Sequence, residues 1–323
     1  MRILEVQTEH TQPFKTLIEV LKDMLPETNI EFKMDRPTNK KHDADKTNSE
    51  IDPDDRNDED DDNNTDQNPD VDTSGIRILA VDTTKTVLIN MKLEKKNFSK
   101  FKCARKKMVL GVNLVYFHKL IKSVDKEEHM TLFVDEEDPH YLGIILDNPT
   151  KNKQEVVNMK LLDLGNDDID IPKITFDAVM QINASEFHKL CREMKQLSEY
   201  MEIVCSSKKV EFICKGEYAN KKVTYETDDN NGDSVDIKFS NSCTNQIIQG
   251  IYDLNHLVLF GKCSVLCGDI QLYMKNDYPL VIKYILPKLG RILLCLTPIN
   301  NENKQENFEE NEQYYSDEEV EFK

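Results

Sequence analysis

The chain lacks the residue patterns that most enzymes, metal proteins and membrane proteins carry. It has no phosphate-binding glycine loop and no nucleophile placed with a base at a known motif spacing. None of its eight cysteines forms a C-x-x-C pair, and Cys263 and Cys267 have no histidine at zinc-finger spacing. No apolar run approaches the roughly 18 residues of a membrane-spanning helix. We therefore expect no enzymatic activity, no cofactor, no metal ion and no membrane partner.

Two further absences concern cellular location and calcium. Arg2 and Glu5 interrupt the start of the chain, so we expect no signal peptide and an intracellular protein whose cysteines stay reduced. The Asp-rich stretch 54–62 lacks the residue order and the central glycine of an EF-hand loop, which argues against a specific calcium site.

The formal net charge of −18 is concentrated in two segments. Residues 35–72 contain 15 acidic and 5 basic side chains, and residues 300–323 contain 9 acidic and 2 basic. Residues 54–66 hold no apolar side chain, so burial cannot offset the entropy of ordering them. We expect a disordered acidic insert over 35–74 and a disordered acidic tail over 300–323. The remaining body is nearly neutral, and its size, about 260 residues, fits two domains.

The tetrapeptide Phe-His-Lys-Leu occurs twice, at 117–120 and at 187–190, and such an internal repeat bears on the whole fold. A third copy begins at Phe14 and a fainter one near Gln246. The first three copies carry apolar residues at helical period. These are Phe14, Leu17, Ile18 and Leu21, then Phe117, Leu120, Ile121 and Val124, then Phe187, Leu190, Cys191 and Met194.

Basic residues lie opposite this apolar stripe, given the period of a helix. The second copy has Lys119 and Lys122 there, and the third has Lys189 and Arg192. The first copy departs, with Thr16 and Glu19, but it carries Lys15 and Lys22 on the flank. One interpretation is a solvated helix surface, and the other is a surface that meets a polyanion.

The pattern of helix-like and strand-like segments predicts an α+β fold with antiparallel sheets. Helices are expected over 12–24, 113–123, 185–197 and from Asn245 towards Leu259, and strands outnumber them about three to one. The alternation at Val210–Ile213 predicts one buried and one exposed face. We expect two similar domains, 1–162 and 173–299, joined by the acidic, proline-ending loop 163–172. In that loop, Ile169 and Ile171 either anchor it to the body or offer an apolar patch to a partner.

Several short stretches of the sequence match those of a known family and occur in the same order along the chain. They are Leu21-Lys-Asp23, Leu79-Ala-Val-Asp82, Gly111-Val-Asn-Leu114, Met159-Lys-Leu-Leu-Asp-Leu164, Ile171-Pro172, Glu186-Phe187, Gly216-Glu217, Asp277-Tyr-Pro-Leu-Val281 and Leu296-Thr-Pro298. Together they resemble the proliferating cell nuclear antigen (PCNA) family of DNA sliding clamps, in a divergent viral or protist form. The acidic insert and the tail after Pro298 have no counterpart in that family.

The resemblance implies a sliding-clamp fold, in which a homotrimeric ring of six similar domains encircles double-stranded DNA without reading its sequence. Helices line the hole, and each domain packs two of them on antiparallel sheets. The implied partners are DNA polymerase and other replication or repair proteins with short clamp-binding peptides, a clamp loader, and the chain itself. The implied location is the nucleus, or a cytoplasmic viral replication site if the source is a virus. The acidic charge is compatible with this function, because topology would hold a ring on DNA with only weak contacts.

The resemblance also assigns residues. Those expected to face DNA are Lys15, Lys22, Lys119, Lys122, Lys189, Arg192, Lys195 and Lys262. Those expected to bind a partner peptide are Val81, Lys85, Leu88, Ile169, Ile171, Pro172, Pro279, Leu296 and Pro298. Those expected at the subunit interface are Val156, Val157, Met159, Lys222, Val223 and Tyr225. Departures from the family are Lys85 in place of a common histidine, Cys295 in place of an aromatic residue, and Ser207 in place of a modifiable lysine.

Two alternatives stay open. A subunit of a heterotrimeric checkpoint clamp would share the fold but have other partners. An acidic histone chaperone or DNA mimic would use the segments 35–72 and 300–323, but it would leave the repeated basic helix faces without a role.

Overall fold

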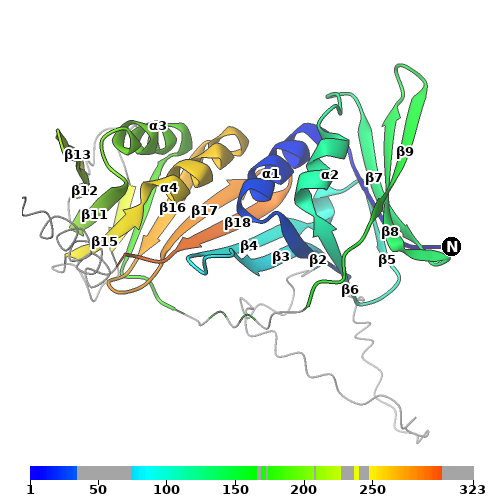
Figure 1. Cartoon of the computed structure of the whole chain (residues 1–323), viewed down its shortest axis with the longest axis horizontal. Coiled ribbons are helices and arrows are strands. Elements are labelled where there is room, and N and C mark those ends of the chain that lie inside the picture. Colours follow the sequence, from blue (N-terminus) through cyan, green and yellow to red (C-terminus); the bar gives the residue numbers. More distant parts are fainter. Residues whose placement is uncertain are drawn as a thin grey trace, which may run out of the picture.

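The computed structural model describes residues 1–34, 74–165, 169, 171, 174–206, 209–226 and 247–299, together with the backbone of 236–239. Within these residues four helices lie in a row along one side of the sheets (Figure 1). The insert was expected to be disordered over 35–74 and the tail over 300–323. Residues 35–73 and 300–323 lie outside the described residues, whereas Ser74 is described and buried. None of the helices in the described part of the chain is long and apolar enough to cross a membrane.

The elements before the loop 163–172 alternate strands with two helices. They are β1 (Arg2–Thr8), α1 (Thr11–Met24), β2 (Glu27–Lys33), β3 (Gly75–Val81), β4 (Val87–Glu94), the short helix η1 (Lys95–Asn97), β5 (Lys100–Cys103), β6 (Lys107–Asn113), α2 (Leu114–Ile121), β7 (His129–Asp135), β8 (Asp138–Asn148) and β9 (Lys153–Lys160).

The elements after that loop repeat the same theme. They are β10 (Ala178–Asn183), α3 (Ala184–Lys195), β11 (Tyr200–Ser206), β12 (Lys209–Lys215), β13 (Asn220–Glu226), β14 (Asp236–Phe239), β15 (Ile248–Asp253), α4 (Leu254–Gly261), the short helix η2 (Lys262–Leu266), β16 (Asp269–Met274), β17 (Leu280–Leu286) and β18 (Gly290–Leu296).

Three antiparallel sheets form the body. The central one has nine strands in the order β14-β10-β16-β17-β18-β4-β3-β2-β6 and runs through both halves of the chain. The halves join where β18 pairs with β4, with Cys295 opposite Leu88. A five-stranded sheet ends in β9 and a four-stranded sheet ends in β13. These two edge strands lie at opposite ends of the molecule (Figure 1).

The helix layer covers one face of the central sheet with the predicted apolar stripes. Eleven of the twelve stripe residues are buried and Leu120 packs partly buried against the same core, which confirms that prediction. The helices α1 and α2 meet through the rings of Phe14 and Phe117, whose centroids are 6.2 Å apart. The helix α3 packs against α4, and α1 contacts α4 and η2, so the four helices form one continuous layer.

Side-chain caps fix where three helices begin. The carboxamide of Asn113 accepts a hydrogen bond from the Tyr116 amide at the start of α2, and Asn183 accepts from the Ser185 amide at the start of α3. The carboxylate of Asp253 accepts from the Asn255 amide at the start of α4, with an N–O distance of 2.6 Å. Each cap satisfies a backbone amide that has no partner within its helix.

The predicted fourth helix was wrong in its start. Residues from Asn245 were expected to be helical, but Ile248–Asp253 is strand β15, which pairs with β11, and α4 begins only at Leu254. The strand β6 was not predicted; it pairs with β2 along its length. The acidic insert lies between the two strands of a hairpin, because Phe32 of β2 lies opposite Ile76 of β3.

The alternation predicted at Val210–Ile213 is confirmed in part, because Val210 and Phe212 are buried and Ile213 is half-buried. Glu211 was expected on an exposed face of β12, but it is only 9% exposed. Its carboxylate accepts hydrogen bonds from Lys209 (2.7 Å) and lies 2.8 Å from the ammonium of Lys222. These two ammonium groups lower the pKa of Glu211 and keep it charged, which explains how a carboxylate can lie so close to the sheet surface. The cysteines of the described residues are all free thiols.

Candidate functional site

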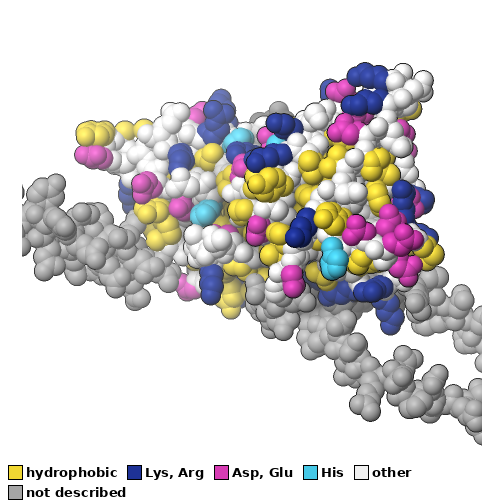
Figure 2. Space-filling view, turned by 45° about the vertical axis from the view of Figure 1, so that its right-hand side comes forward, with side chains coloured by type: hydrophobic (Ala, Val, Ile, Leu, Met, Phe, Trp, Pro, Cys, Tyr) yellow, Lys and Arg dark blue, Asp and Glu magenta, His cyan; other side chains and the backbone are white. Residues whose placement is uncertain are grey.

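Five of the eight predicted DNA-facing residues extend from α2 and α3 and are exposed, and Lys262 at the start of η2 is exposed as well. Lys119 and Lys122 extend from α2 and its C-terminal end, and Lys189, Arg192 and Lys195 from α3. The Lys189 side chain is 79% exposed, and its ammonium lies 4.0 Å from Glu193. Figure 2 shows Lys and Arg side chains in dark blue, mixed with acidic and apolar ones, along the upper side where the helices lie. This surface can meet a polyanion without rearrangement.

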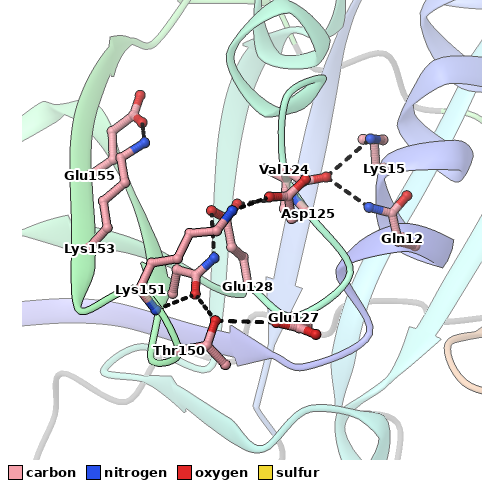
Figure 3. Close-up of polar contacts among 11 residues, drawn as sticks. Gln12, Lys15, Val124, Asp125, Glu127, Glu128, Thr150, Lys151, Lys153 and Glu155 are labelled. Atoms are coloured by element: carbon pink, nitrogen blue, oxygen red, sulfur yellow. Dashed lines mark hydrogen bonds and ion pairs between the residues drawn. The ribbon is translucent and has the colours of Figure 1, made fainter.

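The other three predicted cations are engaged in contacts within the chain. Beyond the end of α2, the ammonium of Lys15 donates to the backbone carbonyl oxygen of Lys122 at 2.9 Å. It also donates to that of Val124 at 3.2 Å (Figure 3). A positive charge at this position stabilises the carbonyl end of a helix. Lys15 therefore joins α1 to α2 as well as contributing charge to the layer.

Lys22 and Lys262 share one carboxylate. Lys22 donates to Asp23 at 2.6 Å and Lys262 donates to the other oxygen of Asp23 at 2.8 Å. Partial burial opposes ionisation of Asp23, but the two ammonium groups outweigh it and lower the pKa of its carboxyl group. This pairing links α1 to η2 across 239 positions of sequence. It partly offsets the charge of two cations on the surface that was expected to meet DNA, although the Lys262 side chain remains 48% exposed.

Tyr116 on α2 is a residue that the sequence pattern did not single out. It is 59% exposed, and the Lys119 ammonium lies 4.6 Å from the centre of its ring. The ring therefore holds Lys119 by a cation–π contact. The sequence did contain a signal for this residue. Tyr116 is an aromatic residue outside the apolar stripe, on a helix that also carries exposed lysines.

The edge strand β9 carries the predicted interface residues of the first half. Val156 is 54% exposed and Val157 is half-buried, but Met159 is only 8% exposed and belongs mainly to the core. Polar contacts hold the turn that leads into β9 (Figure 3). The ammonium of Lys151 lies 3.1 Å from Asp125, and the Thr150 hydroxyl donates to Glu127 at 3.2 Å.

The edge strand β13 carries the predicted interface residues of the second half. Val223 and Tyr225 face the core side, where the Tyr225 hydroxyl donates to Glu186 of α3 at 3.0 Å. Lys222 faces the other side, towards Glu211. The side chains of β13 are thus mostly committed within the chain, and what it offers to a neighbour is its unpaired backbone edge.

A row of apolar side chains crosses the central sheet on the face away from the helices. Residues directly opposite one another in neighbouring strands point to the same face, so the strand register defines the row. Val81 is 37% exposed and the other five side chains are half-buried. We call this set the outer apolar row; it consists of Val81, Leu88, Cys295, Val281, Tyr273 and Val179.

The outer apolar row has an aromatic pair near one end and a neutral thiol at its centre. At one end the ring of Phe176 packs on Tyr273, with centroids 5.5 Å apart. At the centre, burial raises the pKa of the Cys295 thiol to about 11, so this side chain is neutral and apolar near neutral pH. The row therefore presents a wide apolar strip with an aromatic pair at one side.

A rigid turn between β3 and β4 flanks the other end of the row. The Asp82 carboxylate accepts hydrogen bonds from the amides of Thr86 (2.9 Å) and Val87 (2.8 Å). Within this turn Lys85 is exposed and has a φ of 58°, a left-handed backbone conformation. Among the described residues Lys85 has no ion-pair partner, so its charge is available to a ligand.

The six other residues predicted to bind a peptide have mixed outcomes. Pro279, Pro298, Ile169 and Ile171 are half-buried, and Pro172 lies outside the described residues. Leu296 was expected on the pocket wall, but it is 1% exposed and faces the core opposite Val87. Its neighbour Cys295 takes the outward position, because successive residues of a strand point to opposite faces.

The start of the loop 163–172 is attached to the edge of the central sheet. The Leu162 amide donates to the Gly111 carbonyl oxygen at 2.9 Å, and the Asn29 side chain donates to the Gly165 carbonyl oxygen at 3.0 Å. A Cβ atom at Gly111 would lie 2.2 Å from the Leu162 carbonyl oxygen, so only glycine allows this close approach.

Comparisons with known proteins agree with this architecture. The family model "Proliferating cell nuclear antigen, N-terminal domain" matches residues 61–170, and "Proliferating cell nuclear antigen, C-terminal domain" matches residues 170–299. The crystal structure of proliferating cellular nuclear antigen from Entamoeba histolytica is similar in fold, with a TM-score of 0.72 at 19% identity. That match covers 93% of this chain and 100% of the other.

Three sequence relatives carry names of the same kind. A probable DNA polymerase sliding clamp of Acanthamoeba polyphaga mimivirus is 27% identical over 94% of this chain, which spans 63% of that protein's length. A probable DNA polymerase sliding clamp of Paramecium bursaria Chlorella virus 1 is 29% identical, over 70% of this chain and 85% of the other. The proliferating cell nuclear antigen of Chaetomium thermophilum is 27% identical, over 72% and 88%. With its two matching domain models and this fold, the chain belongs to the proliferating cell nuclear antigen family of DNA sliding clamps.

Proposed function

We propose that three copies of this chain close head to tail into a ring that encircles duplex DNA and tethers DNA polymerase to it. The observation that carries the proposal is the single helix layer, from which Lys119, Lys122, Lys189, Arg192 and Lys195 extend on one side of the molecule. In a closed ring this layer lines the hole. The ring acts as a processivity factor and catalyses no reaction itself.

The two edge strands support the ring. A strand edge with unpaired backbone groups is an aggregation hazard unless something covers it. Here β9 and β13 are edges at opposite ends of the molecule, so pairing β9 of one copy with β13 of the next joins identical subunits head to tail. Val156 and Val157 add apolar contact to that junction.

Sequence-independent contacts to DNA suit the mixed charge of the helix layer. Binding to duplex DNA from free solution requires many neutralised phosphates, and a chain with net charge −18 is repelled at long range. A ring loaded onto the duplex by a clamp loader is held by topology, so a few weak contacts are sufficient. Weak contacts also allow the ring to slide.

The outer apolar row supports the docking of partner peptides. The family binds short segments with a glutamine, an aliphatic residue and two aromatic residues, and the row offers apolar surface with Lys85 at its edge. The half-buried Ile169 and Ile171 of the connecting loop, with Pro279 and Pro298, contribute to the same site. Polymerase and other replication or repair proteins would bind here, in the nucleus or at a viral replication site.

Charge reversal on the helix layer tests the DNA contacts. The variant Lys119→Glu, Lys122→Glu, Lys189→Glu should remain a trimer by light scattering but lose support of processive synthesis. The slope of the logarithm of its duplex-binding constant against the logarithm of salt concentration should become shallower by about one unit per lost phosphate contact. The matched control reverses three exposed lysines outside the helix layer, Lys102, Lys106 and Lys288. If both triple variants support synthesis equally, the helix layer does not face DNA.

A further inference from the structure

The described residues end beside the outer apolar row. Cys295 is a member of the row, and the last described residue, Ile299, follows four positions later. The Thr297 amide donates to the Thr86 carbonyl oxygen at 3.0 Å, and the Ile299 amide donates to the Ile251 carbonyl oxygen at 2.8 Å. These bonds fix the point from which residues 300–323 continue, next to the β3–β4 turn and Lys85.

The sequence of 300–323 is unusual for a purely solvating acidic tail. It contains the adjacent pair Tyr314 and Tyr315, directly after Gln313, and further apolar residues at Phe308, Val320 and Phe322. Acidic side chains surround them, 9 against 2 basic ones. Each aromatic side chain gains binding free energy when an apolar surface covers it. The tail therefore has the chemistry of a weak ligand for an apolar strip with a cation at its edge.

The length of the tail allows it to return to its own chain. Tyr314 follows Ile299 by 15 positions, which span up to roughly 50 Å when fully extended. The outer apolar row crosses six strands at spacings of about 4.8 Å, so its whole width is roughly 24 Å. Every point of the row is within reach with slack, and no neighbouring subunit is needed.

Charge favours the same placement. Lys85 is exposed, lacks an ion-pair partner among the described residues, and stands beside Val81 and Leu88. The acidic residues on either side of the tyrosine pair, Glu312 and Asp317, can approach it when the pair lies on the row. The docking row is thus apolar with a positive edge, and the tail is aromatic with negative flanks.

We propose that Tyr314 and Tyr315 dock on the outer apolar row of the same chain, as an internal occupant that a partner peptide must displace. This inference rests on the proposed docking function of the row. A short flexible tether holds a ligand at an effective concentration on the order of 1 mM. A tail that binds with a dissociation constant on the order of 0.1 mM would then weaken an outside peptide by about tenfold. The clamp would select strong partner peptides and reject weak ones.

The test uses the full chain throughout. The probe is a fluorescent synthetic peptide with glutamine, an aliphatic residue and two aromatic residues, and its dissociation constant is measured by anisotropy. The variant Tyr314→Ser, Tyr315→Ser should bind the probe about tenfold more tightly than wild type. The matched control, Val320→Ser, Phe322→Ser, changes two apolar residues of the same tail and should bind like wild type. An unlabelled peptide of residues 300–323, added to the tyrosine variant, should compete with the probe.

The outcomes separate the two proposals. If every form binds the probe with the same affinity, the row is a docking site but the tail does not occupy it, and the inference is wrong. If no form binds the probe, the docking function of the row fails, and the inference fails with it. If the control variant gains as much affinity as the tyrosine variant, the tail acts through general apolar or acidic character, and the assignment to Tyr314 and Tyr315 is overturned.

Discussion

On the paired strands β4 and β18, neighbouring residues point to opposite faces of the sheet. A substitution on the core face should therefore change stability, and one on the outer face should mainly change peptide binding. Leu296 is 1% exposed and lies opposite Val87 on the core face, whereas Leu88 lies opposite Cys295 on the outer face. Truncating a fully buried leucine to alanine costs about 2–5 kcal/mol, because transfer energy is lost and a cavity remains. Leu296→Ala should therefore lower the free energy of unfolding by that amount, which a urea titration with fluorescence or circular dichroism measures.

Leu88→Ala should mainly weaken peptide binding and should cost less stability than Leu296→Ala. Burying a leucine completely is worth about 1.5–3 kcal/mol, and roughly half of this remains to be gained when a peptide covers a half-buried side chain. The loss is then about 1 kcal/mol, a roughly fivefold weaker dissociation constant by calorimetry. Its free energy of unfolding should fall by about 1 kcal/mol, less than for Leu296→Ala, because only about half of the side chain is buried in the free chain. Measuring both in the Tyr314→Ser, Tyr315→Ser background keeps the tail from masking the loss.

A specific result would refute this reasoning. If Leu296→Ala keeps the wild-type midpoint while losing peptide affinity, then Leu296 faces outward and the register of β18 against β4 is misassigned. If Leu88→Ala binds the peptide as well as its parent does, the outer apolar row is not the docking surface.

The other predictions concern assembly, pH and the helix layer. Val157→Glu should convert trimers to monomers in light scattering, whereas Ile285→Glu, on an interior strand, should leave the oligomer intact; equal behaviour would show that β9 is not an interface. The pKa of Asp23 is lowered in the folded chain, so its stabilisation is present above the unfolded value of about 3.9 and is lost as pH falls through the lower folded value. The urea midpoints of wild type and Asp23→Asn should accordingly converge in that acid range and differ at neutral pH. Lys15→Met should lower thermal stability, because it removes the contact to the end of α2, and Lys122→Met should not.

The repeat in the sequence was enough to predict the helix layer. Residues such as Phe14, Phe117 and Phe187 recur at helical period, and a stripe of that kind has to be buried. The start of α4 was mispredicted because the spacing of Ile248, Ile251 and Tyr252 fits a helix as well as a strand. Pairing with β11 decides in favour of the strand, and this partner is remote in sequence. Pattern alone cannot supply such a contact.

The sequence could not show those features of the candidate site that depend on neighbouring segments or on strand register. Helical period placed Lys22 correctly on α1, but it could not reveal that Asp23 holds Lys262 from 239 positions away. The resemblance placed Leu296 in the pocket and marked Cys295 only as a departure from the family, whereas the register puts Cys295 on the outer face and Leu296 in the core. A shift of one residue exchanges the core and the surface, so register must be known before a side chain is assigned to either.

The same alternation explains how one thin body can serve several partners at once. The strands β4 and β18 direct Ile89 and Leu294 towards the helix layer and Leu88 and Cys295 away from it. A peptide on the outer apolar row therefore lies a full sheet away from the cations of α2 and α3, and neither ligand has to displace the other. In the proposed ring, the edges β9 and β13 make a third contact, between subunits. A partner peptide should face competition for the outer apolar row only from a segment of the chain that starts beside the row and carries both aromatic and acidic residues. Residues 300–323 meet that description.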